Sequence, residues 1–219
     1  MKTKLFSKVA IWILNILVAQ GFINCAQCGK ISAALSLDCN YPPMGGTTED
    51  LILINYEDIE SVARNTDNPQ VIEAINRDTG SSAYKFEGKN ESVEPQVNLV
   101  KQRYADCYDH EVMFIIFLNT PDAKKQIKGM VNGKLVAVVE NKHRNSAGGE
   151  TSFEIYGLGV GLYVMELSRV VVDADTQGAY KIILRTPENA KEANLPNPLW
   201  LTSYAVSRAV FDGLLTPAA

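Results

Sequence analysis

The chain has 219 residues, of which 46% are hydrophobic and 21% are charged, and its formal net charge is −4. This composition is that of an ordinary globular protein, long enough for one domain with a substantial core. The acidic balance argues against a protein that grips nucleic acid through a basic surface.

Residues 1–26 have the order of a secretory leader. Lys2, Lys4 and Lys8 precede the apolar run VAIWILNILVA, which is short for a membrane span. Asn24 stands where a cleavage site after Ala26 needs a small residue. Three interpretations stay open: a leader for export, a start codon assigned too far upstream, and an apolar arm. Without these residues the chain has 18 basic and 25 acidic residues, a net charge of −7.

Runs of β-branched and aromatic residues, bounded by turn residues, predict strands along the rest of the chain. They are LILINY (51–56), SAYKFEG (82–88), EVMFIIFL (111–118), KLVAVVE (134–140), SFEIYG (152–157), VMELSRVVV (164–172) and AYKIILR (179–185). QVIEAI (70–75) fits either a helical turn or a strand. We therefore expect a mainly β fold.

Two helices interrupt this pattern. In NTPDAKKQIKGMVNG, Thr120 is placed as an N-cap, Pro121 opens the helix, and Gly133 follows its end. A second helix is predicted within LTSYAVSRAVFDGLL near the C-terminus. The sequence predicts one β domain over residues 27–198 and an arm or helix over residues 199–219.

The cysteines allow a metal site only if three of them share it with one distant ligand. A four-ligand zinc site would need Cys25, Cys28 and Cys39 together with Cys107 or His110. The sequence has no second CxxC pair, and the histidines lack ligand spacing. Unpaired or disulfide-linked structural cysteines are the favoured interpretation, and no metal ligand is predicted.

The stretch EIYGLGVGLYVMEL places glycines at positions 157, 159 and 161. A dinucleotide fingerprint would need a third glycine where Leu162 stands and a helix after it. A valine-rich segment follows instead. We expect the glycines to form a strand bend with positive φ or close backbone approach.

Two acidic motifs are also given structural roles. In YDHEV, Asp109 and Glu111 share one face of a strand and His110 lies on the other, so a pairing role is favoured over catalysis. Asp173 and Asp175 provide too few ligands for a calcium site and are predicted to lie at a turn. No catalytic residue and no cofactor is predicted.

The loop ENKHRNSAGGE (140–150) is long for a hairpin connection and carries a basic, glycine-containing tip. Such a tip on an acidic body suits contact with an acidic surface of another copy, although a solvated loop without a partner is the alternative. The candidate inter-subunit contact residues are Lys142, His143, Arg144, Gly148 and Gly149.

The order of several segments resembles virion structural proteins of phages and prophages of Bacteroidota, relatives of the tail tube proteins of long-tailed phages. The segments span about residues 28–198 and are GGTTEDLILINYEDI, AYKFEGKNES, YDHEVMFIIFLNTPDAKKQIKGMVNGKLVAVVENK, FEIYGLGVGL and DTQGAYKIILRTPENAKEANLP. The resemblance implies an antiparallel β-sandwich with one flanking helix, and subunits that close into hexameric rings stacked as a tube.

The resulting hypothesis is a noncatalytic tail tube subunit, assembled in the host cytoplasm, with itself and other tail proteins as partners and DNA as non-specific cargo. Segments 111–140 and 134–157 are expected to act as hairpins that pair with neighbouring subunits. The alternative is an exported β-sandwich binding or adhesion module, in the periplasm or outside the cell. An enzyme that uses His110 with Cys107 is the least favoured hypothesis.

Overall fold

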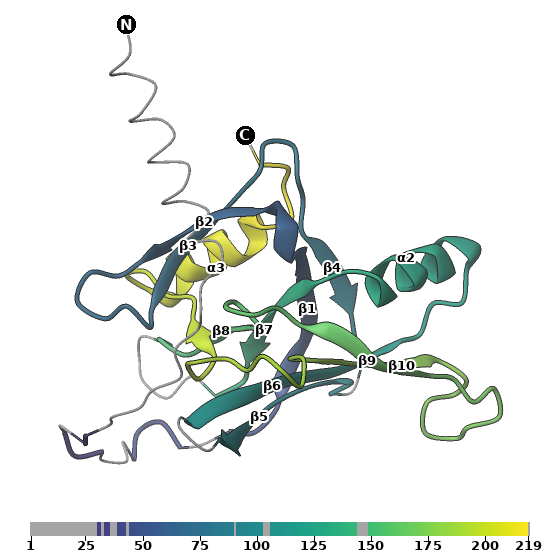
Figure 1. Ribbon diagram of the computed structural model, residues 1–219, viewed down its shortest axis with the longest axis horizontal. Helices are drawn as coiled ribbons and strands as arrows, with labels where there is room; N and C mark the ends of the chain where they lie inside the picture. Colours follow the sequence, from purple (N-terminus) through teal and green to yellow (C-terminus); the bar gives the residue numbers. More distant parts are fainter. Residues whose placement is uncertain are drawn as a thin grey trace, which may run out of the picture.

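The computed structural model describes residues 30–31, 33–35, 39–42, 44–89, 91–102, 106–143 and 149–218. Within this part of the chain the protein is mainly β, with antiparallel sheets and two α-helices, which confirms the predicted fold class. Figure 1 shows the sheets through the centre and lower part of the molecule, with one helix at the upper left and the other at the upper right.

Three sheets make up the described fold, and all their strand pairs are antiparallel. The five-stranded sheet has the order β11-β8-β7-β1-β4, formed by Asn197–Pro198, Phe153–Tyr156, Leu135–Asn141, Thr47–Asn55 and Tyr84–Glu87. The four-stranded sheet has the order β5-β6-β10-β9, formed by Val93–Lys101, Asp106–Ile116, Tyr180–Arg185 and Tyr163–Ser168. A hairpin pairs β2 (Ile59–Arg64) with β3 (Ile72–Arg77), and the 3-10 turn η1 (Tyr56–Asp58) precedes it.

The five-stranded sheet is covered on both faces, which explains its uninterrupted apolar strands. In β1, Leu51 and Leu53 face the first hydrophobic core, which lies between this sheet and the four-stranded sheet. Ile52 and Ile54 face the second hydrophobic core, on the opposite side of the five-stranded sheet. All four side chains are at most 1% exposed. Burying one such side chain stabilises the folded protein by about 1.5–3 kcal/mol, so the run LILI contributes to the stability of both cores.

The second core is closed by the C-terminal helix α3 (Tyr204–Gly213) and by the β2-β3 hairpin. Ser203 caps the helix by accepting a hydrogen bond from the amide of Val206. The ring of Phe211 lies 4.9 Å from that of Phe153 in β8. The predicted C-terminal helix is therefore present, and it packs against the sheet.

Helix α2 (Pro121–Val131) lies where the sequence predicts it. The Thr120 hydroxyl accepts a hydrogen bond from the amide of Ala123 at 3.1 Å, and Ile127 and Met130 are buried in the first core. The helix leads from β6 in one sheet to β7 in the other. Segment 111–140 is thus a crossover between sheets, and the expectation that it forms a hairpin is wrong.

Two ambiguous strand predictions are resolved. QVIEAI contributes to a strand, β3, that pairs with β2. The strand predicted at 164–172 ends at Ser168, and its three valines lie in the following loop.

Candidate functional site

The glycine motif forms a tight turn where the chain passes from β8 in one sheet to β9 in the other. Gly157 and Gly161 have φ of +76° and +78°, and the amide of Gly161 donates to the carbonyl of Gly157 at 2.9 Å. A Cβ on Gly157 would lie 2.5 Å from Cγ of Leu162, and one on Gly161 would collide with the Lys134 side chain. The prediction of positive φ and close approach is confirmed at these two positions.

The amides of this turn already bind a carboxylate. Glu192, which is 5% exposed, accepts hydrogen bonds from Gly159 N at 3.0 Å and from Val160 N at 2.8 Å. Burial raises the pKa of Glu192, although the two amide hydrogen bonds and the charge of Lys134 act in the opposite direction. A phosphate at this turn would have to displace the side chain of Glu192.

His110 joins β6 to the same turn. Its Nδ1 accepts a hydrogen bond from the amide of Gly157 at 3.2 Å, so the ring proton lies on Nε2, which donates to the carbonyl of Asn194 at 3.0 Å. Burial lowers the pKa of His110 to about 4, which keeps the ring neutral at physiological pH. Both ring nitrogens are therefore engaged, which leaves neither free to act as a base.

Asp109 is the centre of a second polar cluster on the opposite face of β6. The carboxylate is 1% exposed and accepts hydrogen bonds from Arg185, from the Thr186 hydroxyl and, at 2.9 Å, from Nζ of Lys191. Burial alone would raise the pKa of Asp109, but these hydrogen bonds outweigh it and hold the pKa below its usual value. Arg185 also contacts Glu111 at 3.4 Å, which confirms that Asp109 and Glu111 share a face.

These polar groups have a structural role. They tie segment 186–194 to β6 and to the glycine turn, and the side chains are satisfied by one another and by the backbone. The second acidic motif is similar, because Asp173 accepts hydrogen bonds from the amide of Asp175 and the hydroxyl of Thr176 within a turn. That arrangement agrees with the turn predicted at Asp173 and Asp175.

The described cysteines have different environments. Cys107 is disulfide-bonded and 1% exposed, whereas Cys39 is free and exposed. Cys25 and Cys28 lie outside the described residues. Within the part of the chain that the structure describes, no group of three or more His, Cys, Asp or Glu side chains could hold a metal ion.

Three of the five candidate contact residues are described. Lys142 forms an ion pair with Glu91 at 2.8 Å, and Nδ1 of His143 accepts a hydrogen bond from the amide of Met44 at 3.1 Å. Gly149 is buried in a turn with φ of +71°. Arg144 and Gly148 lie outside the described residues. The described part of this loop contacts its own chain, and its contact with another copy stays a prediction.

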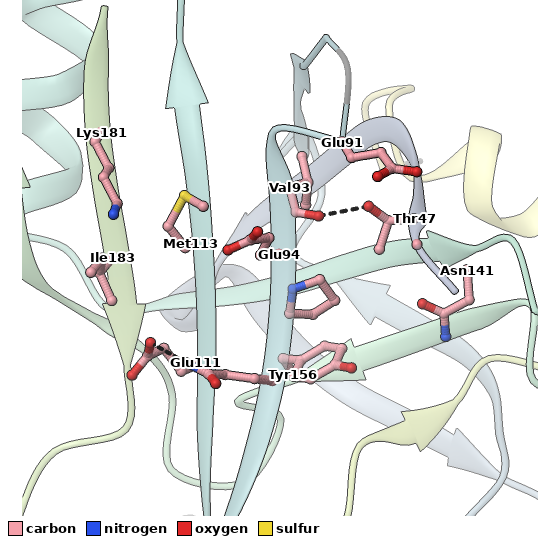
Figure 2. A pocket seen from close by; sticks show the side chains of 13 residues that line it. Thr47, Glu91, Val93, Glu94, Glu111, Met113, Asn141, Tyr156, Lys181 and Ile183 are labelled. Carbon is pink, nitrogen blue, oxygen red and sulfur yellow. Dashed lines mark hydrogen bonds between the residues drawn. The ribbon is translucent and has the colours of Figure 1, made fainter. Parts of the chain in front are cut away.

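A groove of about 620 Å³ lies over the four-stranded sheet beside the start of β1. Figure 2 shows Glu94 and Met113 side by side on neighbouring strands, with Lys181 and Ile183 on the next strand. Glu111, at the lower end of the groove, accepts a hydrogen bond from Gln96. The groove is thus lined by a mixture of charged, polar and aliphatic side chains.

A larger groove of about 970 Å³ opens between the edge strand β4 and helix α2, and we call it the α2 groove. Its apolar lining comes from Phe86 and from the end of β6 and the segment after it, Ile116, Phe117 and Leu118. Phe117 and Leu118 are 39% and 66% exposed. The outer side of β4 pairs with no described strand.

The four-stranded sheet also has two open edges among the described strands, because β5 pairs only with β6 and β9 only with β10. Large apolar side chains are exposed on both edge strands: Leu99 on β5, and Tyr163, Met165 and Leu167 on β9. Open edges with apolar side chains are templates for association unless another chain covers them.

The sequence matches no protein-family model, and no curated protein or solved structure was found to be similar to it. None of the helices within the described ranges is long and apolar enough to cross a membrane.

Proposed function

We propose that the protein is a noncatalytic structural subunit that assembles with copies of itself into rings, stacked as the tail tube of a phage or prophage. The observation that carries the proposal is that both edges of the four-stranded sheet, β5 and β9, are unpaired in the described chain and bear exposed apolar side chains. Pairing between subunits would remove both edges at once.

The geometry of one sheet with two different open edges favours a ring. Pairing of β9 with β5 of a neighbour is a head-to-tail contact, and such contacts close into rings when the rotation between subunits permits it. A sheet edge paired with an identical edge would instead give a dimer. Since β6 and β7 are central strands of their sheets, the edges β5 and β9 replace segments 111–140 and 134–157 as the surfaces that pair.

The charge of the body supports a conduit for DNA. Residues 27–219 carry a net charge of −7, and an acidic wall repels phosphate over a Debye length of about 8 Å at physiological ionic strength. DNA in the lumen would then pass without adhering. The satisfied polar clusters around Asp109, His110 and Glu192 support a structural role, since they serve the fold.

A second candidate function is an exported binding or adhesion module. The observation in its favour is the disulfide at Cys107, because disulfides persist in oxidising compartments and are rare in the cytoplasm. The leader-like order of residues 1–26 points the same way. Intact-mass detection of a mature N-terminus near Gln27 in a periplasmic fraction would favour this function.

The proposal is tested by producing the full chain in the bacterial cytoplasm and examining the concentrated protein by electron microscopy and light scattering. Rings or tubes of uniform diameter are expected. Met165→Lys with Leu167→Lys should prevent assembly because two charges on β9 repel a paired strand. Val206→Lys, at an exposed position of α3, is the matched control and should still assemble. A monomer that persists at high concentration would contradict the proposal.

A further inference from the structure

The α2 groove runs along the free edge of β4. Its lining includes three consecutive residues of that strand, Lys85, Phe86 and Glu87, whose side chains alternate between the two faces of the sheet. A groove that is lined from both faces of one strand lies at the border of the sheet, and Figure 1 shows α2 next to this border. The groove is therefore open to the backbone of β4 as well as to its side chains.

The backbone of this edge has unpaired hydrogen-bonding groups. The amide of Gly88 donates to the carbonyl of Glu49 at 2.7 Å, and the register of the two strands pairs Glu87 with Asp50. Since alternate residues of an antiparallel ladder bond to the same neighbour, the amides and carbonyls of Lys85 and Glu87 point away from β1. No described strand pairs with them. An extended segment beside β4 would therefore complete these hydrogen bonds.

The lining combines apolar side chains with an excess of carboxylates. Phe117 and Leu118 are 39% and 66% exposed, so the groove leaves apolar surface uncovered. Four carboxylates and two ammonium groups line it, which leaves a net charge of −2: Glu49, Asp50, Glu87 and Asp122 against Lys85 and Lys89. Lys85 already contacts Asp50 at 3.1 Å and Glu87 at 3.2 Å. The groove thus favours a ligand that is both apolar and cationic.

Helix α2 presents a carboxylate to the groove and turns lysines away from it. Asp122, Ala123 and Gln126 belong to the lining. Because successive residues of a helix are rotated by about 100°, Lys124 and Lys128 lie on the opposite side of α2. Asp122 is exposed, so its carboxylate is accessible to an incoming cation. The lysines of this helix therefore leave the acidic character of the groove unchanged.

We propose that the α2 groove binds an extended segment of a partner protein in which apolar residues alternate with lysine or arginine. The segment adds a strand beside β4, packs its apolar side chains against Phe117 and Leu118, and places a cation against Asp122. The four residues of β4 provide few backbone hydrogen bonds, so the side-chain contacts select the partner. This inference goes beyond the proposed function and does not depend on self-assembly.

Charge also decides against the open edge strands of a second copy as the occupant. Glu94 lies within β5 and Glu166 within β9, and neither strand alternates cations with apolar residues. The net charge of the groove would repel their carboxylates. A partner segment rich in lysine or arginine meets no such repulsion.

The test is the binding of fluorescent peptides to the full chain, measured by fluorescence anisotropy. A short peptide of alternating lysine and valine is expected to bind, and the same peptide with glutamate in place of each lysine should bind at least about tenfold more weakly. Two further lysine peptides are methylated at alternate sets of backbone nitrogens. Only one of them should lose binding, because only one set of nitrogens faces β4 in an added strand.

Variants of the groove show where the peptide binds. Asp122→Lys and Leu118→Ser should each weaken binding of the lysine peptide by about tenfold. Glu60→Lys is the matched control, since it makes the same charge change at an exposed position of β2 and should leave the affinity unchanged. Leu118 is 66% exposed, so its substitution leaves the fold intact and tests the groove even if Asp122→Lys destabilises the start of α2.

Several outcomes would overturn the inference. Equal affinities for the lysine and glutamate peptides would contradict the role of charge, and an affinity unchanged by both groove variants would place the peptide elsewhere. No difference between the two methylated peptides would contradict strand addition. Tighter binding of a peptide of residues 1–10, which contains Lys2, Lys4 and Lys8, would show that the occupant is a segment of the same chain and not of a partner.

Discussion

The carboxylate of Glu192 lies 3.0 Å from the amide nitrogen of Gly159, so a distant acidic side chain occupies the donors of the glycine turn. Two glycines of the same turn, Gly157 and Gly161, have positive φ. The backbone must turn sharply from one sheet to the other, and the side chain of Glu192 satisfies the amides that the turn exposes. The motif is thus part of the sandwich architecture.

The conformations of the glycines can be tested by a pair of substitutions. Gly161→Ala should lower the free energy of unfolding by more than about 1 kcal/mol, because φ of +78° disfavours alanine and the new Cβ would collide with Lys134. Gly129→Ala in α2 is the matched control, since nothing lies within 4 Å of its Cβ position. It should stabilise the protein by about 0.5–1 kcal/mol. Urea denaturation of both variants measures the difference, and equal effects would contradict the assignment.

The buried state of His110 predicts a pH dependence of stability. The pKa of about 4 in the folded protein lies below the ordinary histidine value of 6.5, so between these two pH values the unfolded chain binds a proton that the folded chain does not. Stability is therefore full above pH 6.5 and decreases as the pH falls toward 4, by roughly 3 kcal/mol when the shift is converted at 1.36 kcal/mol per pKa unit. Urea denaturation across this range should show the loss. His110→Gln should flatten the curve between pH 6.5 and pH 4, and a curve unchanged by this substitution would contradict the role of His110.

Asp109 is predicted to be critical for folding. Asp109→Asn removes the charge that compensates Lys191, whose side chain is only 8% exposed, and should cost about 3–5 kcal/mol of unfolding free energy. Asp106→Asn is the matched control, because the Lys101–Asp106 ion pair lies at the surface and contributes at most about 1 kcal/mol. Thermal denaturation of the two variants distinguishes them. Similar melting temperatures would mean that the Asp109 cluster contributes little.

Local patterns were sufficient for much of the fold. The α2 helix was predictable because Thr120, Pro121 and Gly133 are each specific to one position of a helix. The central strands were predictable because burial on both faces leaves continuous apolar runs, as in β1 and β7. The positive φ values at Gly157 and Gly161 were predictable from the spacing of the glycines, because no helix was predicted after them.

The edge strands β4 and β9 were predicted, whereas β5 and β2 were missed because their composition reflects solvent on one side. The strand β5 was missed since Pro95 interrupts a polar segment, and proline within a strand is tolerated mainly at edges. The strand β2 was missed because IESVAR has little apolar alternation. The valines at 170–172 suggested a longer β9, whereas Arg169 and Gly178 close a loop there.

The contacts of the functional surfaces could not be predicted locally. Lys142 and Glu91 are 51 positions apart in the sequence, and Glu192 and Gly159 are 33 positions apart. Neither contact therefore leaves a signal in neighbouring residues. The α2 groove is formed by β4 and by the segment that leads into α2, and its existence depends on how the two sheets pack.

The cysteines offer a last prediction, which bears on the compartment of the protein. The thiol of Cys39 should react with iodoacetamide in the native protein, whereas Cys107 should react only after reduction and unfolding, because it is disulfide-bonded and buried. Cys107→Ser should lower the free energy of unfolding by about 2–4 kcal/mol, and Cys39→Ser should leave it unchanged. Peptide mapping after labelling gives the first result and urea denaturation the second. If the assembled protein purified from cytoplasm has a reduced Cys107 and full stability, the disulfide does not stabilise the fold and no longer favours an exported module. If the bond forms only in protein recovered from an oxidising compartment, and the reduced protein is less stable by the expected amount, export becomes the better account of residues 1–26.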